Sequence, residues 1–296
     1  MKKIFIAGCG GMLGDAFYNV FKEEFEILCV DINTSEKWLE FLDFRNFENY
    51  YKLVNKFKPD CLVHLGAHTD LEYCERNIDD TYITNTLSVE NAVRISNELS
   101  IPLVFISTAG IFDGKKILYD DWDLPNPLGH YAKSKYAAEK FIQYNCNKYL
   151  ICRAGWMMGG GPRKDKKFVN KIYKQIVKGN KELFVVKDKL GTPTYTHDFV
   201  KNLFKILESG HLGLYNLVCE GNTSRLEVAK EILLTLNLES KISIKAVNSD
   251  YFSTKFFAPR PRSENLINYK LNLRSLNIMR DWRVCLREYL NNEFKI

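Results

Sequence analysis

Short apolar runs alternate with longer amphipathic stretches through the first half of the chain, and this alternation constrains the fold more than any other feature. The apolar runs hold few polar residues, which is typical of strands buried on both faces of a sheet. Because helical periodicity fills the stretches between them, the sequence predicts a doubly wound α/β fold with a parallel sheet. The expected strands are residues 2–8, 26–31, 60–67, 101–108 and 149–155, and the expected helices are 12–25, 47–59, 79–99 and one within 128–148.

The segment GCGGMLG, residues 8–14, joins the first expected strand to the first expected helix. Its glycines permit a tight turn, let backbone amides approach a pyrophosphate, and bring a helix N-terminus towards that charge. Gly8, Gly11 and Gly14 follow the spacing G-x-x-G-x-x-G, and Gly10 fits part of the form G-x-G-x-x-G. We interpret the segment as the dinucleotide-binding turn of a Rossmann-type fold, with an ordinary strand–helix turn as the alternative.

Asp31 ends the second expected strand, where a carboxylate accepts hydrogen bonds from the adenosine ribose of a bound dinucleotide. A 2′-phosphate would be repelled there, and no arginine adjoins the residue. We therefore expect NADH or NADPH as cofactor, with Asp31 favouring NADH. The alternative is an ordinary strand-end aspartate in a turn.

The pattern changes after residue 155, where a glycine-rich and then basic segment, 157–167, predicts a loop over a site or a linker. We expect a dinucleotide-binding domain at 1–156, to which the chain returns around 185–220, and a mainly substrate-binding domain at 157–296. The further expected elements are helices at 168–179, from about 197 and at 223–237, strands at 182–187 and 212–219, and an irregular segment at 258–266, whose prolines remove two donors.

Composition excludes several classes of protein. With 46% hydrophobic and 26% charged residues, the 296-residue chain is typical of a globular protein. A net charge of +6 suits anionic small molecules, and no arginine-rich tract with interleaved aromatics occurs, so we expect no nucleic-acid partner. No run approaches the ~20 apolar residues of a membrane span, and the first run is too short for a signal peptide. We expect a cytoplasmic protein with no membrane partner.

The eight cysteines form no C-x-x-C motif and no cluster with histidine at zinc spacing. Buried, reduced thiols are the usual state of such residues in the cytosol. We therefore expect no metal site.

The stretch LGHYAKSKYAAEKFIQYNCNK, residues 128–148, contains the pattern Tyr-x-x-x-Lys three times. On a helix, a tyrosine and a lysine four residues apart share a face, so each pair could donate a proton together. The pattern alone does not decide among its occurrences, which are Tyr131/Lys135, Tyr136/Lys140 and Tyr144/Lys148 here and Tyr18/Lys22 and Tyr251/Lys255 elsewhere.

The order of these motifs resembles the extended short-chain dehydrogenase/reductase family. The matching segments are GCGGMLG, GAHTD (66–70), STAGIFDG (107–114) and YAKSK (131–135). Further segments are similar to those of the dTDP-4-dehydrorhamnose reductases of that family and extend the resemblance over essentially the whole chain. They are CRAGWMMG (152–159), DKLGTPTYTHDF (188–199), APRPRSENL (258–266) and DWRVCLREYL (281–290).

Position in the expected fold favours Tyr131 and Lys135 over the other pairs. Tyr131 begins the helix that follows the strand carrying Thr108, and such helix starts border the ligand crevice of a parallel sheet. Tyr136 lies about 140° around the helix from Tyr131, and Tyr144 is more than two turns further along, so both are interpreted as packing or surface residues.

The resemblance implies reduction of the 4-keto group of a nucleotide-activated 6-deoxysugar, with dTDP-4-dehydrorhamnose as the first substrate considered. Hydride would come from the nicotinamide while the Tyr131 phenol protonates the developing alkoxide. Lys135 would lower the phenol pKa and hold the nicotinamide ribose, and the Thr108 hydroxyl would hydrogen-bond the carbonyl.

The resemblance also implies binding residues. For the cofactor they are Gly8, Gly10, Gly11, Met12, Leu13, Gly14, Asp31, Asp43, Phe44, Gly66, Ala67, His68, Tyr131 and Lys135, and for the substrate Thr69, Asp70, Trp156 and Arg260. Trp156 would set an apolar face against the deoxysugar methyl, with core packing as the alternative. Arg260 would pair with the diphosphate, with a surface arginine as the alternative. Asn85 matches an asparagine that is more structural than catalytic.

Two departures from the reductases put the substrate in question. Ala109 and Gly110 stand where these reductases commonly have Asp-Tyr, and His68 stands where they have tyrosine. The acidic pair that 4,6-dehydratases use for elimination is also missing, which makes that activity the less favoured one. A sugar-nucleotide epimerase, and a non-catalytic partner such as the regulatory β subunit of methionine adenosyltransferase, remain alternatives. The sequence leaves a homodimer open.

Overall fold

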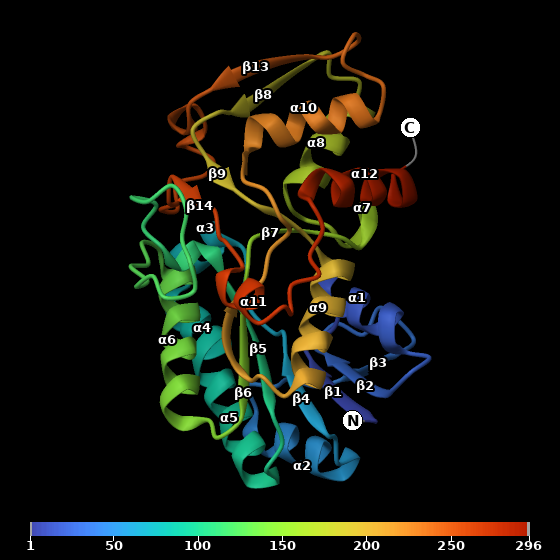
Figure 1. Ribbon diagram of the computed structural model, residues 1–296, viewed down its shortest axis with the longest axis vertical. Helices are drawn as coiled ribbons and strands as arrows, with labels where there is room; N and C mark the ends of the chain where they lie inside the picture. The colour runs from blue at the N-terminus through green and yellow to red at the C-terminus, as the bar shows by residue number, and fades with distance from the viewer. Residues whose placement is uncertain (1, 295–296) are drawn as a thin grey trace.

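A seven-stranded parallel sheet forms the lower half of the molecule in Figure 1, and the computed structural model describes residues 2–294. Its strands are β1 (Lys3–Ala7), β2 (Glu26–Asp31), β3 (Leu39–Phe41), β4 (Cys61–His64), β5 (Leu103–Thr108), β6 (Tyr149–Ala154) and β11 (Gly213–Asn216). Their order across the sheet is β11-β6-β5-β4-β1-β2-β3, and every neighbouring pair is parallel. The predicted α/β fold with a doubly wound parallel sheet is confirmed.

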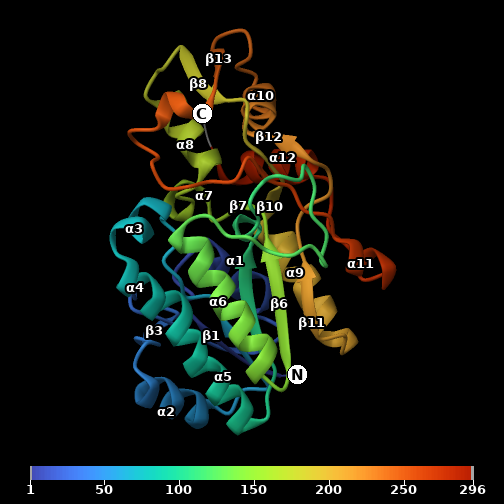
Figure 2. The ribbon, with the colours of Figure 1, turned by 90° about the vertical axis from the view of Figure 1, so that its left-hand side faces the viewer.

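Helices cover both faces of this sheet, as Figure 2 shows. Along β1, Ile4 and Ile6 belong to one hydrophobic cluster, whereas Phe5 and Ala7 belong to another. Successive strand residues point to opposite faces, so both faces of β1 are buried, and this explains its uninterrupted apolar run. The helices packed on the first face are α1 (Met12–Phe21) and α9 (Thr196–Ser209), and those on the second are α2 (Phe47–Phe57), α5 (Ser88–Leu99) and α6 (His130–Asn145).

The strand order reverses between β1 and β4. From β1 the chain proceeds outward to β2 and β3, then returns to β4 on the opposite side of β1. In open parallel sheets, ligands bind beyond the carboxyl ends of the strands at such a reversal. The segments that follow β1 and β4, residues 8–14 and 65–70, therefore border the expected crevice.

A second region, in the upper half of Figure 1, contains shorter sheets and further helices. Its helices are α7 (Gly161–Lys164), α8 (Phe168–Val177), α10 (Arg225–Thr235) and α12 (Trp282–Glu293). Its paired strands are β7 (Trp156–Met158) with β10 (Pro193–Tyr195), β8 (Glu182–Val186) with β13 (Ser243–Val247), and β9 (Leu190–Gly191) with both β12 (Thr223–Ser224) and β14 (Ser263–Glu264). Short α11 (Tyr269–Leu273) and η3 (Ser249–Phe252) complete the chain's later half.

The helix predicted at 79–99 is confirmed in extent, because residues 78–99 are helical throughout, but it is not one regular α-helix. Helices α3 (Leu71–Arg76) and α4 (Ile78–Tyr82) lead into a π-helical turn, η1 (Ile83–Leu87), before α5 begins at Ser88. The wide turn contains the buried Asn85, whose side chain bonds backbone and side-chain groups outside the helix. Single π-helical turns of this kind are common at functional sites.

The irregular segment predicted at 258–266 is also partly wrong. Pro259 and Pro261 come before β14 and do not interrupt its backbone pairing. Ser263 and Glu264 therefore pair with Leu190 and Gly191 of β9. α10 begins with a side-chain cap, because the Ser224 side chain accepts a hydrogen bond from the Glu227 N–H. A short 3₁₀ turn, η2 (Ala109–Ile111), directly follows β5.

Within residues 2–294, no helix is long and apolar enough to cross a bilayer. All eight cysteines are buried free thiols. The same residues contain no group of three or more His, Cys, Asp or Glu side chains arranged to hold a metal ion.

Candidate active site

The glycine turn between β1 and α1 is shaped by close backbone contacts. Gly8 has a φ of +78°, and a Cβ there would lie 2.3 Å from the backbone N of Gly66. A Cβ on Gly14 would lie 2.1 Å from the Cys9 carbonyl oxygen, whereas Gly11 has nothing within 4 Å of the same position. No side chain caps α1 at Gly11, so the first amides of the helix have no side-chain acceptor there and can bind an anion.

Met12 and Leu13 differ in their surroundings. Leu13 packs in the core, so only its backbone is available to a ligand. Met12 lies next to Gly160, and a Cβ added to Gly160 would lie 3.3 Å from the Met12 Cβ. The glycine-rich segment after β7 therefore approaches the dinucleotide turn.

Asp31 turns back onto the glycine turn. Its carboxylate accepts hydrogen bonds from the Gly10 N–H and the Asn33 N–H, each at 2.9 Å. A Cβ on Gly10 would lie 2.9 Å from the Asp31 carboxyl carbon, so glycine is required for this approach. The carboxylate is therefore fixed at the carboxyl end of β2 with lone pairs remaining for a ribose hydroxyl.

The segment after β4 is held to α6 through Asn85. The Asn85 side chain accepts from the His68 N–H at 2.7 Å and donates to the His68 carbonyl at 3.1 Å. It also donates to the Ser134 hydroxyl at 3.1 Å, and Ser134 in turn donates to the Tyr131 carbonyl. Asn85 thus fixes the position of one predicted cofactor-binding segment relative to the helix that carries Tyr131.

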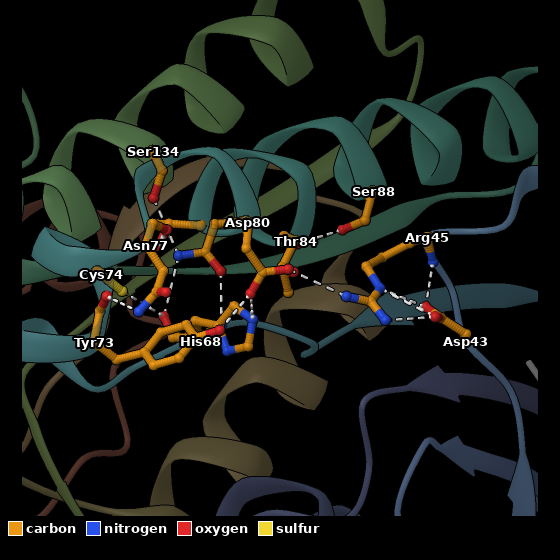
Figure 3. Close-up of polar contacts among 12 residues, drawn as sticks. Asp43, Arg45, His68, Tyr73, Cys74, Asn77, Asp80, Thr84, Ser88 and Ser134 are labelled. Carbon is orange, nitrogen blue, oxygen red and sulfur yellow. Dashed lines mark hydrogen bonds and ion pairs between the residues drawn. The ribbon is translucent and has the colours of Figure 1, made fainter.

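Asp43 and His68 belong to one polar cluster, which Figure 3 shows in close-up. Arg45 forms an ion pair with Asp43 at 2.7 Å, and hydrogen bonding to Arg45 holds the pKa of the Asp43 carboxyl below its usual value. The His68 ring lies 2.7 Å from Asp80, which also accepts a hydrogen bond from the Tyr73 hydroxyl. Both predicted cofactor residues therefore already have side-chain partners within the protein.

The remaining predicted residues near β4 have mixed surroundings. The Phe44 ring occupies the space beside Gly66, because a Cβ added to Gly66 would lie 2.2 Å from the ring. Ala67 is half-buried beside Gly66. Thr69 is exposed and accepts hydrogen bonds from Lys167, while Asp70 caps α3 by accepting from the Tyr73 N–H.

Thr108 and Tyr131 meet where β5 ends and α6 begins. The Thr108 hydroxyl lies close enough to the Tyr131 phenol to lower its pKa, but burial outweighs this effect and raises the pKa of Tyr131 to about 12. The Thr108 hydroxyl also accepts the Gly110 N–H at 3.1 Å. Tyr131 is therefore protonated at neutral pH and is positioned beside a second hydroxyl group. The expected lowering of its pKa by Lys135 is not found in this structure, because burial dominates.

Lys135 lies one turn after Tyr131 and is almost fully buried. Its ammonium group is 3.9 Å from the centroid of the Phe105 ring. Burial lowers the pKa of Lys135 to about 7, and the nearby Glu139 opposes this shift. Glu139 itself forms a buried ion pair with Arg153 at 2.9 Å, which joins α6 to β6.

The other Tyr/Lys pairs of the repeated pattern lie elsewhere. Tyr136 is partly buried against a small cluster that includes Phe112 and Tyr119. Tyr144 is 76% exposed, and Tyr251 is 56% exposed. Of the pairs considered, only Tyr131/Lys135 combines a buried lysine with a half-buried tyrosine beside Thr108 in the described part of the chain.

Trp156 belongs to a group of side chains and a glycine from four separate segments, which we call the sugar-side cluster: Trp156, Gly191, Arg225 and Glu264. The Trp156 indole N–H donates to Glu264 at 2.7 Å. The Arg225 guanidinium lies over the indole at 3.5 Å, and burial lowers the Arg225 pKa to about 10. A Cβ on Gly191 would lie 2.2 Å from the indole, so glycine is needed to seat the ring.

Arg260 already has a partner within the chain. Its guanidinium forms an ion pair with Glu72 at 2.7 Å and donates to the Ala258 carbonyl at 2.9 Å. Lys189 donates to the carbonyls of Arg260 and Pro261. A diphosphate contact by Arg260 would therefore compete with Glu72 for the same guanidinium.

Three residues of this site had no predicted role. Arg225 and Glu264 both contact Trp156. In the sequence, however, Arg225 only follows the Ser224 helix cap, and Glu264 belongs to a segment in which only Arg260 and the prolines were assigned a meaning. Gly191 lies within the matched segment 188–199 without a distinguishing spacing. No local pattern connects three positions so far apart in sequence.

Comparison with known proteins places this geometry among reductases. The chain is 29% identical to the spore coat polysaccharide biosynthesis protein SpsK of Bacillus subtilis (strain 168), over 98% of this chain and 97% of that protein. It is 28% identical to dTDP-4-dehydrorhamnose reductase of Escherichia coli (strain K12), covering 85% and 86% of the two chains. The crystal structure of dTDP-4-dehydrorhamnose reductase from Bacillus anthracis str. Ames in complex with NADP has a TM-score of 0.89 and 28% identity, covering 98% and 99%.

The family model described as RmlD substrate binding domain matches residues 1–294, almost the whole chain. The resemblance predicted from the sequence motifs is thereby confirmed. The protein belongs to the RmlD substrate binding domain family.

Proposed function

We propose that this protein uses NADH or NADPH to reduce the 4-keto group of a nucleotide-activated 6-deoxysugar, with dTDP-4-dehydrorhamnose as the first substrate to test. The observation that carries the proposal is the contact between the half-buried Tyr131 and Thr108 at the carboxyl end of β5, one helical turn from the buried Lys135. Membership of the RmlD family and two relatives named as dTDP-4-dehydrorhamnose reductases support it.

Tyr131 acts as the proton donor in this proposal. Its raised pKa keeps the phenol protonated at neutral pH, which is the form needed to protonate an alkoxide. The Thr108 hydroxyl donates a hydrogen bond to the carbonyl oxygen as negative charge develops there. After proton transfer, a protonated Lys135 stabilises the tyrosinate through its charge.

The glycine turn fits a dinucleotide cofactor. A Cβ at Gly8 or Gly14 would collide with backbone, and the uncapped N-terminus of α1 offers amides to a pyrophosphate. When bound, NAD(P)H supplies the hydride. The chain's own contribution is to bind the phosphates at Gly11, orient the ribose through Asp31 and hold the proton at the Tyr131 hydroxyl.

The test is nicotinamide absorbance with purified protein and 4-keto-6-deoxy sugar nucleotides generated in situ, with and without a 3,5-epimerase. Oxidation of NAD(P)H that requires the epimerised dTDP sugar supports the proposal in full. Oxidation with a different sugar nucleotide keeps the reaction but contradicts dTDP-4-dehydrorhamnose as substrate. Absence of oxidation across the panel, while the cofactor still binds, contradicts the reductase function.

A further inference from the structure

Glu264 is a carboxylate beside the predicted catalytic group that the proposed reaction has not yet used. One of its oxygens, Oε2, accepts the Trp156 indole N–H. The other, Oε1, lies 3.4 Å from where a Gly110 Cβ would stand, and the Thr108 hydroxyl oxygen lies 3.4 Å from the same point. The Glu264 charge also acts on Tyr131, whose raised pKa is caused mainly by burial and in smaller part by Glu264. Glu264 therefore reaches from β14 to the carboxyl end of β5.

The backbone on either side of Glu264 is fixed. The neighbouring Ser263 donates its hydroxyl to the Ile117 carbonyl, and the Tyr119 N–H donates to the carbonyl of Asn265. β14 pairs with β9, where Gly191 leaves room for the Trp156 ring. The backbone that carries Glu264 is thus fixed, and the hydrogen bond from the indole orients the carboxylate.

One oxygen of this carboxylate is free to bind a ligand. Among residues 2–294, no group donates a hydrogen bond to Glu264 Oε1, although the cations of Arg225 and Lys189 interact with the charge at longer range. A half-buried carboxylate is an acceptor only, so its natural ligand is a hydroxyl or an N–H group. Gly110 has no side chain at this point, so nothing of its own separates Glu264 Oε1 from the Thr108 hydroxyl.

We propose that Glu264 is a specificity-determining residue whose Oε1 accepts a hydrogen bond from the substrate hydroxyl on the carbon next to the reduced carbonyl. This inference rests on the proposed function, in which that group is the 3-hydroxyl of a 4-keto-6-deoxy sugar. A site built to hydrogen-bond a hydroxyl rejects an analogue that lacks it, because the acceptor, covered by the bound analogue, is then left unpaired. Glu264 of β14 would thereby contact the sugar beside Ala109 and Gly110, which follow β5.

The test compares the parent sugar nucleotide with its 3-deoxy analogue in the wild type, Glu264→Ala and Glu264→Gln. We expect the wild type to prefer the parent by ~10- to 100-fold in kcat/KM, the range of a hydrogen bond to a charged group. Glu264→Ala should lose this preference by slowing only the parent reaction. Glu264→Gln keeps an acceptor for Trp156 and should be intermediate. The matched control is Glu227→Gln, an exposed carboxylate of α10 that pairs with Lys230.

Calorimetric binding of the two reduced sugar nucleotides, parent and 3-deoxy, gives the same comparison without turnover. If the wild type binds both products with the expected preference but reduces no keto sugar, the proposed function fails while the inference about Glu264 holds. If Glu264→Ala keeps the wild-type preference, or weakens both compounds equally, Glu264 only supports Trp156 and the inference is overturned. Cofactor affinity should stay unchanged in both variants, which shows that they are folded.

Discussion

The cofactor side and the sugar side of the site are held together by different means. On the cofactor side, backbone approaches backbone: Gly8 lies against Gly66, and Gly14 lies against the Cys9 carbonyl. On the sugar side, side chains approach one another, with Arg225 over Trp156 and Trp156 bonded to Glu264. A backbone contact cannot yield to a new atom, whereas a side chain can rotate. The cofactor side is therefore the rigid half of the site and the sugar side is the adaptable half.

Tyr131 and Thr108 lie between the two halves, and the largest effect is expected there. Tyr131→Phe removes the proton donor but leaves the ring, so turnover should fall by ~10²- to 10⁴-fold. NAD(P)H binding, measured by nicotinamide fluorescence, should be unchanged. Tyr136→Phe is the matched control on the same helix and should keep wild-type turnover, since Tyr136 packs in a separate cluster. An active Tyr131→Phe variant would remove Tyr131 from the mechanism.

Glycine substitutions test the rigidity of the cofactor half. Gly14→Ala places a Cβ 2.1 Å from the Cys9 carbonyl oxygen, so it should lower the free energy of unfolding by about 3 kcal/mol and weaken cofactor binding. Gly11→Ala meets nothing within 4 Å and should fold with wild-type stability. Urea unfolding of the two variants measures the difference. Equal stabilities would mean that the turn is not rigid.

Lys135 gives a pH test within the same rigid half. Burial lowers its pKa to about 7 in the folded protein, against ~10.4 in an unfolded chain. Between these values the unfolded state binds more protons, so stability attributable to this group rises as pH increases. Relative to Lys135→Met, the wild type should therefore gain about 2 kcal/mol between pH 7 and pH 9. Parallel unfolding curves for the two proteins across this range would show that the ammonium is not destabilised by burial.

The adaptable half should respond to a new methyl group in another way. Gly191→Ala places a Cβ 2.2 Å from the Trp156 indole, which can turn aside and release Glu264. We expect the KM for the sugar nucleotide to rise about tenfold, the value of one lost hydrogen bond, with the unfolding midpoint nearly unchanged. A loss of stability like that of Gly14→Ala, measured by the same urea unfolding, would erase the distinction between the two halves.

The same distinction explains how much could be predicted from the sequence. The glycines of residues 8–14 and Asp31 are local consequences of one βα unit each, so periodicity and spacing were enough to select them as candidates. Thr108 was selected through the family resemblance. The π-helical turn at 83–87 could not be predicted. It accompanies the hydrogen bonds of Asn85 to His68 and Ser134, which are distant in sequence.

The sugar-side cluster could not be predicted either, because it also depends on contacts between segments that are distant in sequence. Its members come from positions 156, 191, 225 and 264. The pairing of β9 with β12 and β14 brings the last three together, and the Trp156 ring packs against them. The family resemblance supplied Trp156 without its partners. The roles of the site residues and the domain division at residue 156 stay predictions until variants are measured.

Asp31 provides the smallest expected effect and concerns cofactor choice. Both carboxylate oxygens accept backbone N–H groups, so the charge is fixed where a ribose 2′-hydroxyl would bind and a 2′-phosphate would be repelled. We infer a preference for NADH, although the structure of the Bacillus anthracis relative is a complex with NADP. Asp31→Ala should weaken NADH by ~10-fold or less, as expected for one hydrogen bond, while NADPH binding stays equal or improves. Fluorescence titration of both cofactors measures this. A variant with the same ratio of affinities as the wild type would mean that Asp31 orders the glycine turn through Gly10 and does not touch the ribose.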